Sequence, residues 1–148
     1  MKTVMVVDDD QSILMVMEEL LNDIGYSAVT VSNGYEALDA IKERKPDLIL
    51  LDLEMTPIDG WQVLEHLRKD GVSNIPVMLF TAKYILEEEN VLYKDDIILV
   101  LQKPVTLDEL KNVLQEYFNG NILPGVKEIS GSRHCDSIRG IGCAVRFI

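Results

Sequence analysis

The sequence has few of the residues from which metal centres and nucleophile triads are most often built. It contains 2 cysteines and 2 histidines in 148 residues. Cys135 and Cys143 both lie within residues 121–148, and the seven residues between them do not match the spacing of a zinc site. His66, the only histidine before that segment, falls among polar positions of a predicted helix. These shortages argue against zinc centres and histidine-based nucleophilic catalysis.

Basic residues and long hydrophobic runs are also scarce. The chain carries 14 Lys and Arg against 25 Asp and Glu, a formal net charge of -11. Such a charge disfavours direct binding of nucleic acid, whose phosphates attract basic surfaces. No apolar run approaches the length that spans a bilayer, and residues 1–4 lead into a strand without a signal-peptide pattern. The expectation is a cytoplasmic protein that does not bind a membrane.

The stretch from Pro46 to Gly60 organises the rest of the chain. Four branched aliphatic residues, 48–51, have no polar alternation and therefore predict a strand buried on both faces. The strand ends at Asp52, just before a turn rich in Pro, Asp and Gly. Ligands of open parallel α/β sheets bind at the carboxyl ends of the strands, so Asp52 is a candidate functional residue.

Polar side chains also follow other predicted strands. Thr3 to Val7 is followed by three consecutive aspartates, 8–10. The apolar run from Ile75 to Phe80 leads to Thr81, and the run from Ile97 to Leu101 leads to Lys103. A second strand, Tyr26 to Val31, precedes Asn33 and Gly34. Five predicted strands thus place acids, a hydroxyl group and a cation at one edge of a sheet.

Helices are predicted between these strands from apolar residues at helical spacing and from capping residues. They follow Asp10, Asn33, Gly60 and Thr106, and a shorter one covers Tyr84 to Leu92. Five strands alternating with five helices predict an α/β fold, a doubly wound parallel sheet with helices on both faces.

The regular pattern stops after Gly120. We expect one folded domain over residues 1–120 and a tail over residues 121–148. The tail holds 4 basic and 2 acidic residues, in contrast to the acidic remainder. Its composition leaves three alternatives open: a loosely ordered tail, a docked extra strand, or an artificial extension.

The strand-end residues favour one kind of chemistry. Asp8, Asp9 and Asp52 would gather carboxylates at one edge, and carboxylates with water and phosphate oxygens are the ligands that Mg²⁺ prefers. Lys103 and Thr81 could then surround a phosphoryl group, with Asp52 as the nucleophile that forms an acyl phosphate.

Four motifs resemble the receiver domain of two-component response regulators over about residues 1–119. They are Val6 to Asp10, Leu50 to Gly60, Phe80 to Lys83, and Lys103 with Pro104. The resemblance implies a flavodoxin-like five-stranded sheet in the order 2-1-3-4-5. It also implies a stand-alone signalling switch rather than an enzyme. Its partners would be a sensor histidine kinase or phosphotransfer protein and a downstream protein target, and it allows a phosphorylation-dependent dimer.

The same resemblance implies roles for individual residues. Asp52 corresponds to the phosphoacceptor, and Thr81 and Lys103 to the residues that contact the phosphoryl group. For Mg²⁺, the implied ligands are Asp9, Asp52, the main-chain carbonyl of Glu54, and Asp8 through a bound water. One position departs from the family: Val100 stands where a tyrosine or phenylalanine often couples the site to the surface.

Two other interpretations remain open. The first is a phosphatase resembling the haloacid dehalogenases, although their nucleophile follows the first strand and here Asp52 follows the third. The second is a receiver-like binding module that has lost the phosphorylation switch, which the presence of Asp9, Asp52, Thr81 and Lys103 disfavours.

Overall fold

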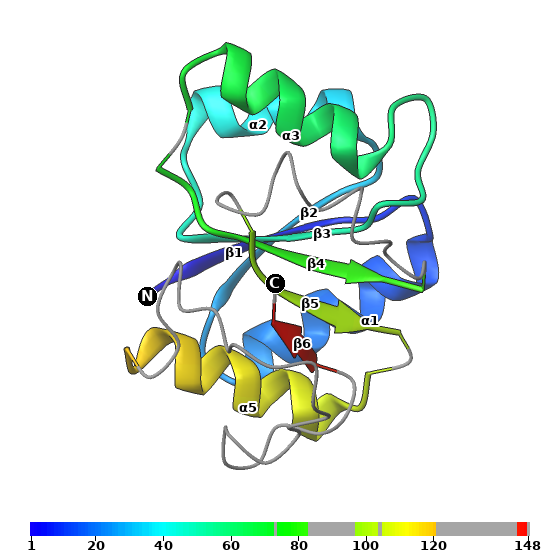
Figure 1. Cartoon of the computed structure of the whole chain (residues 1–148). Coiled ribbons are helices and arrows are strands. Elements are labelled where there is room, and N and C mark those ends of the chain that lie inside the picture. Colours follow the sequence, from blue (N-terminus) through cyan, green and yellow to red (C-terminus); the bar gives the residue numbers. More distant parts are fainter. Residues whose placement is uncertain (73, 83–96, 104, 121–144, 148) are drawn as a thin grey trace.

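A computed structural model describes residues 1–72, 74–82, 97–103, 105–120 and 145–147. A six-stranded sheet crosses the centre of the molecule (Figure 1), in the order β2-β1-β3-β4-β5-β6. Its strands are β1 (Thr3–Val7), β2 (Ser27–Val31), β3 (Leu48–Leu51), β4 (Val77–Thr81), β5 (Ile97–Gln102) and β6 (Val145–Phe147). The helices are α1 (Gln11–Asp23), α2 (Gly34–Glu43), α3 (Gly60–Lys69) and α5 (Leu107–Phe118).

The five strands β1 to β5 are parallel, and their order 2-1-3-4-5 confirms the predicted flavodoxin-like sheet. Helices α1 and α5 cover one face and α2 and α3 cover the other (Figure 1). Residues 48–51 of β3 are buried throughout, as their uninterrupted apolar run predicts. The helix expected over Tyr84 to Leu92 lies outside the described residues.

Successive side chains of a strand point to opposite faces of the sheet and so belong to two separate hydrophobic cores. Strand residues of one parity, such as Val6, Leu50 and Leu101, pack with α1 and α5. Residues of the other parity, such as Val7 and Leu51, pack with α2 and α3. In β1, β3, β4 and β5 this two-sided burial leaves only the ends of the strands for polar side chains, whereas β2 is half-buried throughout.

Local capping bonds fix where the helices begin. Asp10 caps α1 by accepting a hydrogen bond from the amide of Ser12, and Asn33 caps α2. At α5 the predicted capping box is present, because Thr106 and Glu109 exchange side-chain and backbone bonds. Among the described helices, none combines the length and the hydropathy needed to cross a membrane.

Strand β6 lies in the tail, for which the sequence left a docked extra strand open as one of three alternatives. It pairs antiparallel with β5, with Val145 opposite Leu101 and Phe147 opposite Leu99. These three residues correspond to the docked-strand alternative for the tail, while residues 121–144 lie outside the described residues.

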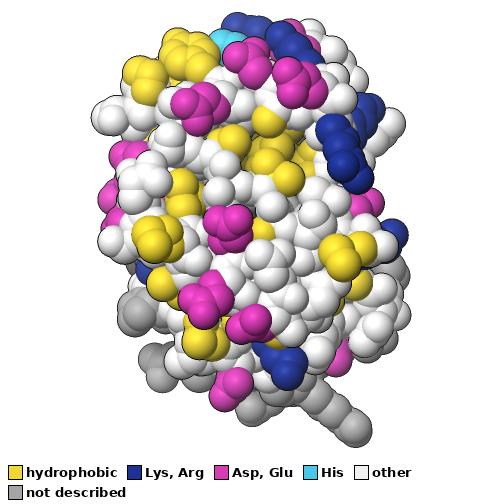
Figure 2. All heavy atoms as spheres, turned by 180° about the vertical axis from the view of Figure 1, so that it is seen from behind, with side chains coloured by type: hydrophobic (Ala, Val, Ile, Leu, Met, Phe, Trp, Pro, Cys, Tyr) yellow, Lys and Arg dark blue, Asp and Glu magenta, His cyan; other side chains and the backbone are white. Residues whose placement is uncertain are grey.

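The surface carries the acidic excess seen in the sequence. Acidic side chains are distributed over the face seen from behind, whereas lysine and arginine side chains gather mainly along its top and right margins (Figure 2). Hydrophobic side chains appear there in several separate groups. The exposed hydrophobic residues include Met15 and Val16 of α1 and Tyr35 of α2. His66 is half-buried rather than fully exposed as its place among polar helix positions predicts, and its Nδ1 lies 2.8 Å from the carbonyl oxygen of Gln62.

Candidate functional site

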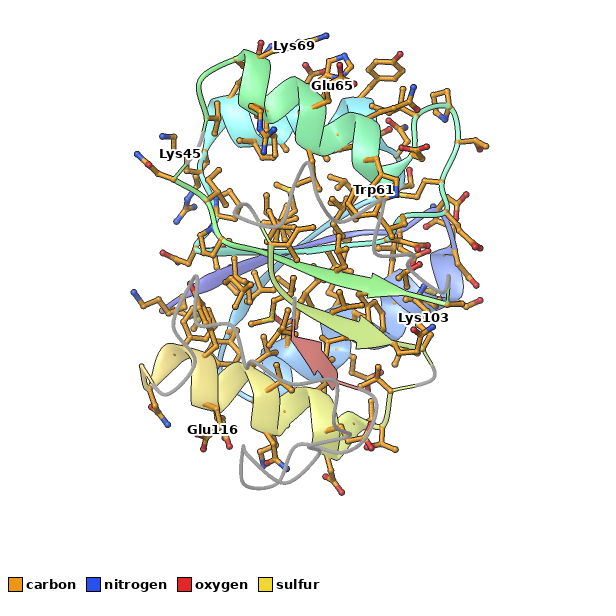
Figure 3. All side chains as sticks on the ribbon, viewed as in Figure 1. Lys45, Trp61, Glu65, Lys69, Lys103 and Glu116 are labelled. Atoms are coloured by element: carbon orange, nitrogen blue, oxygen red, sulfur yellow. The ribbon has the colours of Figure 1, made fainter. Side chains whose placement is uncertain are left out.

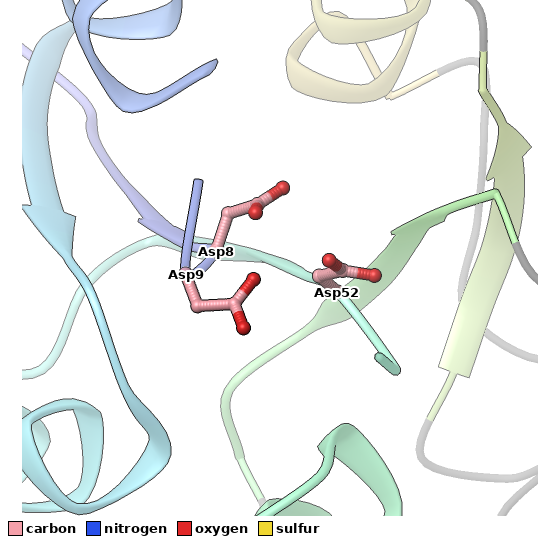
Figure 4. A group of neighbouring side chains, drawn as sticks. All are labelled: Asp8, Asp9 and Asp52. Carbon is pink, nitrogen blue, oxygen red and sulfur yellow. The ribbon is translucent and has the colours of Figure 1, made fainter. Parts of the chain in front are cut away.

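The carboxyl ends of β1 and β3 bring three aspartates together. Val7 pairs with Leu51, so that Asp8 and Asp52 follow side by side at the end of the two strands. Carboxylate oxygens of Asp8, Asp9 and Asp52 all lie within 4.8 Å of one another (Figure 4). The sequence-based expectation that these acids share one edge of the sheet is therefore met.

Backbone amides hold two of these carboxylates in place. Asp8 Oδ1 accepts a hydrogen bond from the amide of Asp10 at 2.9 Å, and Asp52 Oδ1 accepts one from the amide of Glu54 at 3.2 Å. Both side chains are buried, with exposed fractions of 1% for Asp8 and 6% for Asp52, whereas Asp9 is exposed. The site thus has a fixed interior part and one carboxylate that faces solvent.

Lys103 supplies the positive charge that the acids need. Its Nζ lies 2.5 Å from Asp8 Oδ2 and 3.5 Å from Asp52 Oδ2. The Lys103 amide donates to the carbonyl of Thr81 at 2.8 Å, which ties the end of β5 to the end of β4. The lysine side chain lies at the end of the sheet opposite to Lys45 (Figure 3). One ammonium group therefore bridges the two buried carboxylates.

The environment of Asp52 sets its protonation. Burial raises the pKa of the Asp52 carboxyl, and the nearby charge of Asp8 adds to this rise. The charge of Lys103, the Glu54 amide and a hydrogen bond from the Thr81 side chain lower the pKa in turn, but the net shift is upward. Thr81 itself is fully buried at the end of β4. An additional cation would favour the charged form of Asp52.

The loop between β3 and α3 is anchored by its own side chains. Leu53, Met55 and Ile58 are buried in the core beneath α2 and α3, while Glu54 is exposed. Anchoring on both sides of residue 54 fixes the backbone directly after Asp52. The main-chain position expected to bind a metal therefore lies between two residues whose side chains are buried.

Two glycines allow this loop to pack closely. A Cβ atom on Gly60 would lie 2.5 Å from the backbone oxygen of Asp52 and 2.9 Å from Leu53 Cα. A Cβ on Gly34 would lie 2.5 Å from Ile58 Cγ1 and 2.6 Å from Val63 Cγ2. Sequence reasoning treated Gly60 only as part of a turn and a motif. The sequence did hold a signal of this close approach. Gly60 is the first residue of a helix, a position at which alanine has the higher helix propensity.

We expect Gly60→Ala to lower the free energy of unfolding by about 1–3 kcal/mol, because the new methyl group displaces backbone atoms of Asp52 and Leu53. The matched change Gly34→Ala meets Ile58 Cγ1 and Val63 Cγ2, which belong to buried β-branched side chains with little room to move, so it should cost a similar amount without displacing the Asp52 backbone. Urea denaturation measures both losses. Amide resonances of Asp52 and Glu54 should move in the Gly60 variant only, and equal shifts in both variants would contradict the distinction.

Val100 occupies the position at which the sequence departs from the resembled family. It is 3% exposed, lies opposite Leu79 of β4 and Arg146 of β6, and packs in the core beneath α2 and α3. The aliphatic side chain therefore has almost no exposed surface through which to report the state of the site.

Comparison with known proteins gives one consistent family. The sequence profile of the response regulator receiver domain matches residues 4–115. A probable transcriptional regulator ycf27 of Guillardia theta is 42% identical over 79 residues, which cover 53% of this chain and 30% of that protein. The chain thus spans about a third of the length of such curated relatives. The polar-differentiation response regulator DivK of Brucella anthropi is 29% identical over 117 residues, covering 78% of this chain and 95% of that protein.

Solved structures give the same result. The response regulator protein TrrA of Thermotoga maritima, crystallised in complex with Mg²⁺ and BeF, is 32% identical, with a TM-score of 0.67. The match covers 78% of this chain and 98% of that one. The two folds therefore correspond over nearly the whole of the known structure.

Proposed function

Because the chain belongs to the response regulator receiver domain family of two-component systems, we propose that it is a Mg²⁺-dependent switch that accepts a phosphoryl group on Asp52. Receiver domains act as signalling switches and interact with histidine kinases or phosphotransfer proteins. The observation that supports the proposal best is the cluster of three carboxylates within 4.8 Å, bridged by the ammonium of Lys103.

The donor set fits a magnesium ion. Carboxylate oxygens at one edge of the sheet, one of them on an exposed side chain, are the hard ligands that Mg²⁺ takes together with water. The residues that would hold it are Asp9, Asp52 and the main-chain carbonyl of Glu54, with Asp8 acting through water. When bound, the ion would neutralise the carboxylates and the charge of incoming phosphoryl oxygens.

The chain's own residues account for the transfer. One carboxylate oxygen of Asp52 attacks phosphorus, and the bond from phosphorus to the leaving group breaks, with the electron pair departing on that group. Lys103 can move from Asp52 to the phosphoryl oxygens, since its Nζ already lies 3.5 Å from Asp52. The Thr81 hydroxyl, which hydrogen-bonds Asp52, can donate to the same group. Attack by water later cleaves the acyl phosphate and restores the carboxylate.

The proposal extends to the wider role of the chain. Residues 1–120 form the receiver domain, and phosphorylation changes contacts with a downstream protein or promotes a dimer. The phosphoryl group comes from a sensor histidine kinase, a phosphotransfer protein or a small phosphodonor in the cytoplasm. The protein then signals as a single domain and catalyses only its own phosphorylation and dephosphorylation. The similarity to DivK over 95% of that protein's length supports this arrangement.

Incubation with acetyl phosphate and Mg²⁺ tests the proposal. Intact-mass measurement should show the addition of one phosphoryl group, and chelation of Mg²⁺ should prevent it. Under the same conditions p-nitrophenyl phosphate should not be turned over, which separates a switch from a phosphatase. An unchanged mass would contradict the switch, and sustained release of p-nitrophenol would favour the phosphatase.

A further inference from the structure

The ammonium of Lys103 has a third neighbour besides the two carboxylates. Its Nζ lies 4.9 Å from the centre of the Phe80 ring. Phe80 belongs to β4 and is 7% exposed, and the Lys103 side chain is 15% exposed. A cation over the face of an aromatic ring at this distance is attracted by the negative face of the ring, and more strongly where water is largely excluded.

The sheet brings the ring and the ammonium together. Phe80 is opposite Leu101 in the register of β4 and β5, and Lys103 follows two residues later, which places its side chain on the same face of the sheet. Val6 and Leu50 lie on that face too, two residues before Asp8 and Asp52 respectively. The ring, the ammonium and the two carboxylates thus all project on the side of the sheet covered by α1 and α5.

The backbone at this corner is held on both sides. The Lys103 amide donates to the Thr81 carbonyl at 2.8 Å, and Gln102 Nε2 donates to the Ala82 carbonyl at 2.9 Å. The carboxyl ends of β4 and β5 are therefore fixed relative to each other. The remaining freedom lies in the long lysine side chain, which loses rotamer entropy when it is held in one direction.

We propose that Phe80 is a positioning residue, whose ring face directs the ammonium of Lys103 toward the acidic site and steadies it during phosphoryl transfer. This inference rests on the proposed function. The ring attracts the cation without taking one of its N–H donors for a conventional hydrogen bond, so that the N–H groups of Lys103 stay available for oxygen. A carboxylate in the same place would compete with the phosphoryl oxygens for the ammonium.

The ring also suits a cation that has to change partners. Before transfer the ammonium contacts Asp8 and Asp52, and in the phosphorylated state it must turn toward the new oxygens. The attraction to a ring face depends less on direction than a hydrogen bond does, so Phe80 can hold the ammonium in both orientations. The sequence pattern indicated Phe80 only as a buried strand residue, because the contact depends on two side chains from different strands.

Fluorination of the ring at position 80 tests the proposal. Mono-, di- and trifluorophenylalanine nearly preserve the shape of the ring but weaken its negative face step by step. We expect the rate of phosphorylation by acetyl phosphate to fall with each fluorine, by about threefold to tenfold for the trifluoro ring. Phe80→Leu should show a loss of similar size. The same fluorinated residues at Phe118, whose ring packs 5.0 Å from Tyr26 and Tyr117, should leave the rate unchanged.

A second measurement does not depend on phosphorylation. In the unphosphorylated, Mg²⁺-free protein, the losses in unfolding free energy caused by Phe80→Leu and Lys103→Met should be less than additive in the double variant, because each removes the same contact. Additive losses, or rates that do not respond to fluorination, would overturn the positioning role. If the wild-type protein gains no phosphoryl group at all, the proposed function fails, while the double-variant cycle still decides whether Phe80 holds Lys103.

Discussion

Asp52→Asn is expected to remove phosphorylation by acetyl phosphate entirely, a loss in rate of roughly a thousandfold or more. Asparagine has nearly the same shape as aspartate, and its side-chain oxygen can still accept the hydrogen bond from the Glu54 amide. It lacks the charged oxygen that must attack phosphorus. Intact mass after incubation with acetyl phosphate and Mg²⁺ is the measurement.

Loss of folding should not explain that result. Burial raises the pKa of Asp52, which means that the fold disfavours its charged form, so a neutral side chain of the same size should be tolerated. The matched control is Asp10→Asn, a nearby change of the same chemistry at an exposed residue. Asparagine is as good a helix cap as aspartate, so α1 should keep its start. A phosphoryl group gained equally by both variants would show that Asp52 is not the acceptor.

Asp9→Ala is expected to remove the stabilisation of the unphosphorylated protein by Mg²⁺. A ligand that binds only the folded state stabilises it by about 2.7 kcal/mol at a concentration of one hundred times its Kd. Asp9 contributes a carboxylate to the cluster within 4.8 Å, and it is the exposed member, so its removal leaves little buried surface uncovered. Thermal unfolding with and without Mg²⁺ measures the effect.

The comparison without metal adds a second expectation. Asp9→Ala also removes repulsion between neighbouring carboxylates, so the variant should be at least as stable as the wild type when Mg²⁺ is chelated. The Asp10→Asn variant, which loses a charge next to the cluster, should keep the full rise in melting temperature. If Asp9→Ala responds to Mg²⁺ like the wild type, the ion binds elsewhere.

The strands could be predicted from the sequence because their signals are local, whereas their order was implied by the resemblance to receiver domains. The run of residues 48–51 has no polar break, and the strand-end positions of Asp8, Asp52 and Lys103 place them at one edge once a parallel sheet is assumed. The structure brings these three together. Their part in phosphoryl transfer stays a prediction.

Contacts between distant parts of the chain could not be predicted in the same way. The close approach of Gly60 to the Asp52 backbone depends on how α3 enters the core. The contact of Phe80 with Lys103 depends on side-chain directions in two strands. Pairing of β6 with β5 depends on a partner more than forty residues earlier, and three residues carry too little pattern to reveal it.

The pairing of β6 with β5 bears on how the protein avoids aggregation. An edge strand exposes unpaired N–H and C=O groups, to which a strand from another molecule can add. Without β6, that edge would be β5, a six-residue, almost wholly buried apolar strand next to Lys103. The three-residue antiparallel β6 covers part of the β5 edge. It leaves a strand from another molecule only a short row of unpaired backbone groups. The chain thus protects this side of the sheet from intermolecular strand addition with its own later residues.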